Sequence, residues 1–183
     1  MSKIAFVDIE TTGLNFLRDE VIEIGIAIAD SLTEKITEEH NFFMEATRGI
    51  NPEAARVNGY HVGKWGSKAG NPYKIALEVN RILKNADNIY AHNAAFDRSF
   101  LSAFLSTHGV GVRDQPKYFL DTVTLANLFR DAKYFDRVSL DECLDKLNMS
   151  NLRSQKHGAL EDARLLKEVY FKLIKKIQIK WNN

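Results

Sequence analysis

Near its start the sequence reads FVDIETTGL over residues 6–14, and this stretch decides the fold. Residues 4–9 form a short apolar run rich in β-branched side chains, which predicts a strand buried on both faces. Asp8 and Glu10 interrupt that run, and residues i and i+2 of a strand point to the same side, so the two carboxylates are expected next to each other. Such a pair can hold a divalent cation. The alternative is a structural salt bridge for one acid and a turn cap for the other.

The bulk composition predicts a soluble globular protein. A chain of 183 residues is long enough for one domain with a full core, expected over residues 1–183. We find no apolar run long enough to span a bilayer and no signal peptide, so no membrane association is expected. The single cysteine, Cys143, favours a reducing compartment and therefore the cytoplasm. The net charge is only +1, so a nucleic-acid partner would need a local patch or bound metal.

The order of the predicted elements indicates an α/β fold. Strands are expected over 4–9, 21–29, 41–44, 89–91 and 118–120, the first three antiparallel. Helices are expected from Asn51-Pro52, from Asn71-Pro72 to residue 84, and over 94–107, 122–130, 139–147 and 159–178. Residues 62–70 read as a mobile glycine-rich loop in which Trp65 simply packs. Three strands followed by alternating strands and helices predict a mixed five-stranded sheet flanked by helices.

Two more acids are predicted to point inward. In the helix over 94–107, apolar residues follow Asp97 at three, four, seven and eight positions, which places Asp97 on the buried stripe. In the last helix, apolar residues follow Asp162 at four, seven and eleven positions. Either acid alone is explained equally well by a helix N-terminus, where backbone donors stabilise negative charge.

Four inward acids together favour bound cations. Two like charges about 4 Å apart repel by about 4 kcal/mol at an effective dielectric constant of about 20. Carboxylates that converge without a counter-charge would therefore be strongly destabilised. Oxygen ligands favour Mg²⁺ or Mn²⁺ over zinc.

His157 stands five residues before Asp162, which on one helix would direct the two side chains apart. Gly158 can end a loop there, leaving His157 ahead of the helix and free to lean over the acids. We expect His157 to act as a general base on water. A surface histidine without chemistry is the alternative.

Three motifs in this order resemble the DEDDh group of 3′-to-5′ exonucleases, which have a ribonuclease H-like fold. They are FVDIETTGL at 6–14, HNAAFD at 92–97 and HGALEDA at 157–163, and together they cover nearly the whole chain. Within that group the sequence resembles the proofreading (epsilon) subunit of bacterial DNA polymerase III.

The resemblance implies specific roles. Asp8, Glu10, Asp97 and Asp162 would bind two Mg²⁺ or Mn²⁺ ions, and His157 would be the general base. The pocket for the terminal nucleotide would be shaped by Thr11, Thr12, Leu14, Asn93 and Phe96. The implied reaction is two-metal hydrolysis from the 3′ end of single-stranded or frayed DNA, with release of nucleoside 5′-monophosphates, in proofreading or repair and in association with a DNA polymerase.

Some features depart from the family pattern. The family often has Val-His-Gly where this sequence has Val57-Asn58-Gly59, and the printed chain ends at Asn183 without the polymerase-binding segment of epsilon subunits. A catalytic fragment and a free-standing exonuclease both remain open. So do an exoribonuclease that trims RNA ends or short oligoribonucleotides and a non-catalytic binding or scaffold subunit.

Overall fold

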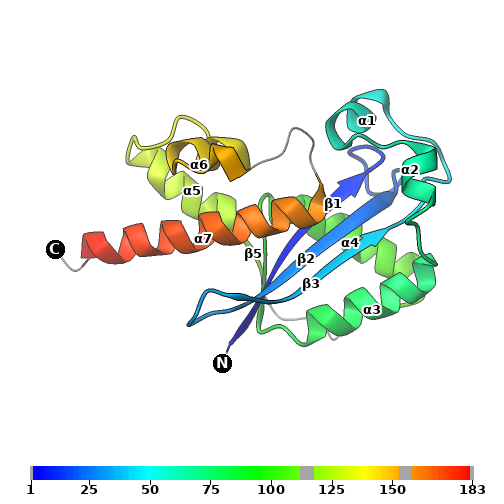
Figure 1. Cartoon of the computed structure of the whole chain (residues 1–183), viewed down its shortest axis with the longest axis horizontal. Coiled ribbons are helices and arrows are strands. Elements are labelled where there is room, and N and C mark those ends of the chain that lie inside the picture. The colour runs from blue at the N-terminus through cyan, green and yellow to red at the C-terminus, as the bar shows by residue number, and fades with distance from the viewer. Residues whose placement is uncertain (1, 112–117, 153–157, 182–183) are drawn as a thin grey trace.

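The computed structural model describes residues 2–111, 118–152 and 158–181 (Figure 1). Within them, five strands form one mixed sheet in the order β3-β2-β1-β4-β5. The strands are β1 Lys3–Thr11, β2 Val21–Asp30, β3 Ile36–Phe43, β4 Asn88–Ala91 and β5 Phe119–Asp121. β1, β2 and β3 pair antiparallel, whereas β4 pairs parallel with both β1 and β5. The predicted fold class is confirmed.

Helices cover both faces of this sheet. They are α1 Pro52–Asn58, α2 Val62–Gly66, α3 Pro72–Lys84, α4 Ala94–Thr107, α5 Thr122–Asp131, α6 Leu140–Lys146 and α7 Ala159–Trp181. α3 and α4 lie on one face and α7 runs across the other, with α5 and α6 packed against α7 (Figure 1). Among the described residues, none of these helices is long and apolar enough to cross a bilayer.

β1 is buried on both faces, as its sequence predicts, and its alternating side chains divide the core. Ala5, Val7 and Ile9 pack with the residues of α3 and α4. Ile4 and Phe6 belong to the cluster under α7. Asp8 and Glu10 continue the α7 face of the strand, so the position of α7 determines what surrounds them.

Two predicted elements were wrong in detail. The third strand runs over Ile36–Phe43, earlier than expected, because this edge strand pairs with β2 through a polar stretch that carries little hydrophobic signal. The segment expected to be a loop contains the short helix α2. Trp65 in that helix is 5% exposed and donates a hydrogen bond from Nε1 to the Ile22 carbonyl at 3.0 Å, so its indole is core material.

α7 begins directly over β2, where the strand has no side chain. Gly25 pairs with Asp8 in the sheet, and a Cβ placed at Gly25 would lie 2.1 Å from the carbonyl carbon of Ala159. The backbone of the first turn of α7 therefore occupies the space that a side chain at position 25 would fill.

We predict that Gly25→Ala destabilises the protein by about 2 kcal/mol or more, because α7 must move away from the sheet. Chemical denaturation would measure this change. Gly111→Ala is the matched control, since a Cβ at Gly111 would meet no atom of the described residues within 4 Å, and it should cost less than about 0.5 kcal/mol. Equal stability of the Gly25→Ala variant and the wild type would contradict the packing described here.

Candidate active site

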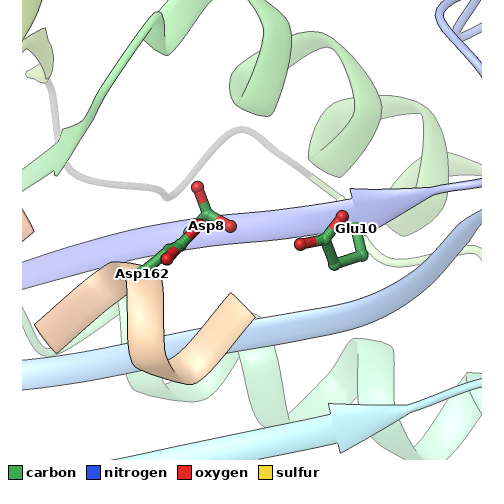
Figure 2. Close-up of side chains that lie close together, drawn as sticks. All are labelled: Asp8, Glu10 and Asp162. Carbon is green, nitrogen blue, oxygen red and sulfur yellow. The ribbon is translucent and has the colours of Figure 1, made fainter. Parts of the chain in front are cut away.

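Three carboxylates meet where β1 approaches its end. Asp8 and Glu10 lie two residues apart on β1 and are half-buried, whereas Asp162 comes from the first turns of α7 and is 5% exposed. One ligand oxygen from each residue can be chosen so that all three lie within 4.8 Å of one another. Figure 2 shows Asp162 directed toward Asp8, with Glu10 further along the strand. This arrangement brings together three of the four predicted metal-binding acids.

Asp97, the fourth predicted acid, reaches β1 from the opposite face of the sheet. It lies in the first turn of α4, is only 3% exposed, and accepts a hydrogen bond from the backbone N–H of Ile9. Burial, with a smaller contribution from the charges of Asp121 and Glu10, raises the pKa of Asp97 to about 8. Asp97 is thus adjacent to the pair on β1, although it is not part of the three-carboxylate group.

A groove of about 420 Å³ runs alongside Glu10, between the end of β1, α1 and the start of α4. Thr11, Leu14 and Phe96, three of the residues predicted to contact the terminal nucleotide, line it. The Leu14 side chain projects into solvent with 87% exposure. The Phe96 ring is partly buried with its centroid 4.8 Å from that of Phe100, so it both lines the groove and packs on the core. The groove has the size and mixed lining of a ligand site.

Thr12 and Asn93, the other two predicted contact residues, are not among the described residues that line the groove. Thr12 is 2% exposed, and its Oγ1 accepts a hydrogen bond from the backbone N–H of Glu20 at 2.8 Å. Asn93 has a left-handed backbone (φ 77°), and its N–H donates to the Asp121 carboxylate at 3.0 Å. In this structure Thr12 thus holds the backbone of the turn after β1, and Asn93 connects the start of α4 to Asp121.

Asn58, which stands where the family often has histidine, joins α1 to the end of β1. Its Nδ2 donates to the Thr11 carbonyl at 3.2 Å, and its Oδ1 accepts from the Tyr60 N–H at 3.0 Å. Gly59 then ends α1 with a left-handed φ of 68°. The side chain of Asn58 is 4% exposed and also contributes to the groove wall.

His157, the predicted general base, lies outside the described residues. Its role therefore stays a prediction. The described chain resumes at Gly158, whose carbonyl accepts the N–H of Asp162 at 2.9 Å.

Two further acids near this group were not predicted from the sequence. Glu23 of β2 is directly opposite Glu10 in the sheet and is 3% exposed. Burial raises its pKa, while hydrogen bonds from the Asn41 side chain and the Ala159 N–H act in the opposite direction. Asp121 caps α5 by accepting the Val123 N–H at 2.9 Å, and its charge also acts on Asp97. An acid inside an apolar strand, the signal that singled out Asp8, was present at Glu23 as well.

A mixed sheet with acids at the end of its central strand, and another on the helix that crosses it, defines the class of ribonuclease H-like nucleases. The model of a family described as Exonuclease (RNase_T) matches residues 5–170. The chain belongs to this exonuclease family. The prediction that the chain is a 3′-5′ exonuclease is confirmed.

Named relatives agree with the family. The chain is 31% identical over 175 residues to DNA polymerase III subunit epsilon of Rickettsia prowazekii. The aligned region covers 91% of this chain and 72% of that protein. It is 30% identical over 169 residues to the PolC-type DNA polymerase III of Thermotoga petrophila, but spans only 12% of that protein. Among solved structures, the zinc-bound complex of Escherichia coli exonuclease I with single-stranded DNA has a TM-score of 0.80 at 16% identity, over 98% of this chain and 42% of that one. This last similarity concerns the fold.

The raised pKa of Asp97 predicts how the stability of the metal-free protein depends on pH. An acid with a pKa of 3.8 in the unfolded state and about 8 in the folded state favours folding at low pH, and that contribution is lost progressively as the pH rises from about 4 to about 8. Asp97→Asn keeps a hydrogen-bond acceptor for Ile9 but cannot ionise. In EDTA, thermal unfolding should therefore show the variant gaining stability over wild type up to about pH 8. A difference in melting temperature that stays constant from pH 5 to pH 9 would contradict the burial of an ionisable Asp97.

Proposed function

We propose that this domain hydrolyses phosphodiester bonds from the 3′ end of single-stranded or frayed DNA and releases nucleoside 5′-monophosphates. The observation that carries the proposal is the three-carboxylate group of Asp8, Glu10 and Asp162 beside an open groove. The relatives are named as DNA polymerase III subunits and polymerases, so we further propose a role in proofreading or repair with a polymerase as partner, in the cytoplasm.

The donor set fits two Mg²⁺ or Mn²⁺ ions. All the grouped ligand atoms are carboxylate oxygens, which these hard cations prefer, and their mutual distances permit a shared ion. Asp8, Glu10 and Asp162 would hold the ions, and Asp97 would complete the set after losing its proton. When bound, such ions lower the pKa of water and stabilise negative charge on the reacting phosphate and the leaving oxygen.

The chain's own residues would orient the substrate and move the proton. The groove beside Glu10 would receive the 3′-terminal nucleoside, with Phe96 and the exposed Leu14 offering apolar surface to a base. The backbone around Thr11, fixed by Asn58, would present that wall at a constant distance from the carboxylates. His157, one residue before the described start of this segment, is our candidate for accepting the proton of the attacking water.

Digestion of matched oligonucleotides tests the substrate class. Single-stranded DNA, RNA of the same sequence and a primer with a mismatched 3′ end would be incubated with and without Mg²⁺ or Mn²⁺, and the products separated by mass. We expect metal-dependent shortening from the 3′ end of DNA with mononucleotide products. Faster cleavage of RNA would favour an exoribonuclease, and binding without hydrolysis would favour a scaffold.

Removing a ligand charge tests the site itself. Asp8→Asn and Asp162→Asn should each lower kcat at least about 100-fold, because each removes an electrostatic contact to the ions, while oligonucleotide binding should persist. Asp141→Asn, in the first turn of α6, is the matched control and should retain full activity. Near wild-type turnover in either site variant would refute the assignment of these acids.

Metal binding should also stabilise the folded protein. A ligand at 100 times its dissociation constant contributes about 2.7 kcal/mol, and the ions additionally relieve the repulsion among the carboxylates. Adding millimolar Mg²⁺ or Mn²⁺ should therefore raise the melting temperature above the value that the metal-free protein shows in EDTA. The increase should disappear in Asp8→Asn, and its absence in the wild type would argue against a preformed cation site.

A further inference from the structure

We propose that Glu23 is a positioning residue whose carboxylate holds the start of α7 so that Asp162 faces Asp8 and Glu10. This inference deepens the proposed function, since it concerns the same site and rests on it for the activity readout. The role is separate from metal ligation, because Glu23 is not a member of the three-carboxylate group.

The contacts of Glu23 join three elements. Its carboxylate accepts hydrogen bonds from the backbone N–H of Ala159, the first residue of α7, and from the Asn41 side chain of β3. The first N–H groups of a helix have no partner within the helix, and a negative charge near them is stabilised by the helix dipole. Glu23 therefore supplies from the sheet the cap that α7 needs.

The neighbouring positions on β2 make this cap directional. Two residues along the same face, Gly25 leaves room for the Ala159 backbone to rest on the strand. Gly25 thus sets how closely α7 approaches the sheet, and Glu23 sets where along β2 the helix begins. Both contacts are needed to set the distance of α7 from the sheet and the place along β2 where it begins.

Asp162 is three residues after Ala159, so its carboxylate moves with the capped turn. One ligand oxygen from each of Asp8, Glu10 and Asp162 lies within 4.8 Å of the other two, so even a small shift of α7 would disturb this arrangement. A misplacement of about 1 Å can cost about 100-fold in rate, and residues that orient metal ligands typically affect metal affinity by 10- to 100-fold. Burying a further acid among carboxylates is unfavourable, and the hydrogen bonds that Glu23 accepts from the Ala159 N–H and the Asn41 side chain offset part of that cost.

The test compares Glu23→Gln, Glu23→Ala and Glu23→Asp in the full chain. Glutamine retains an acceptor at the same reach, alanine removes it, and aspartate keeps the charge but is shorter by one methylene. Mn²⁺ affinity, measured by electron paramagnetic resonance, should fall at least about 10-fold in the alanine and aspartate variants and stay within about threefold of wild type in the glutamine variant. In the metal-free proteins, the Ala159 amide should lose hydrogen-exchange protection in the same two variants.

Activity gives a further readout. The alanine and aspartate variants should lose kcat with KM for the oligonucleotide nearly unchanged, since the groove residues stay in place. Val79→Ala is the control for general destabilisation, because Val79 is fully buried in α3 on the opposite face of the sheet. It should lower the melting temperature without weakening Mn²⁺ binding.

Several outcomes would overturn the proposal. They are wild-type Mn²⁺ affinity in both the alanine and aspartate variants, equal loss in the glutamine variant, or equal loss in Val79→Ala. If alanine prevents folding, the glutamine and aspartate variants decide between acceptor reach and charge. If the wild type hydrolyses no nucleic acid, the proposed function fails, but the Mn²⁺ and hydrogen-exchange measurements still decide the role of Glu23.

Discussion

The contact between the first turn of α7 and the bare backbone of β2 at Gly25 is the constraint on which the site depends. It brings Asp162, more than 150 residues away along the chain, next to Asp8 and Glu10. Like charges at this separation repel by several kcal/mol. The apolar packing of α7 against β1 and β2, through Phe6, Ala27 and Leu166, among others, offsets that repulsion. The helix is therefore held by its buried face, while its first turn carries the carboxylate of Asp162.

The central strand β1 is covered by a different helix on each of its two faces. α7 delivers Asp162 to one side, whereas α4 delivers Asp97 to the other, where the carboxylate accepts the N–H of Ile9. The two contributions approach each other where the strand nears its end, beside the groove that Gly13 and Leu14 help to line. α1 closes the remaining side through Asn58. A site at the end of β1 can be open to solvent, as binding the end of a polymer requires, and still be built on a rigid strand.

The inward direction of Asp97 and Asp162 was predictable because the helix period determines which residues lie on the same face as the buried apolar residues. Both side chains are buried in the structure. Glu23 was overlooked because residues 21–29 were assigned to a strand from their β-branched side chains at every second position, and the small residues on its α7 face, Gly25 and Ala27, were not interpreted as space for a helix. The edge strand β3 and the short helix α2 were misjudged for a related reason. Their conformations depend on partners, Ile22 and its neighbours on β2, rather than on their own patterns.

By itself, the sequence determined the order of the strands and of every helix except α2, the pairing of two acids on β1 and the burial of one acid on each of two helices. These follow from local periodicity, since side-chain direction repeats every two residues in a strand and about every 3.6 in a helix. Only the tertiary structure decided which acids lie together. Asp162 joins the pair on β1, whereas Asp97 reaches β1 from the opposite face of the sheet. Distances between separate elements depend on how closely their backbones pack, and here that closeness depends on the missing side chain at Gly25.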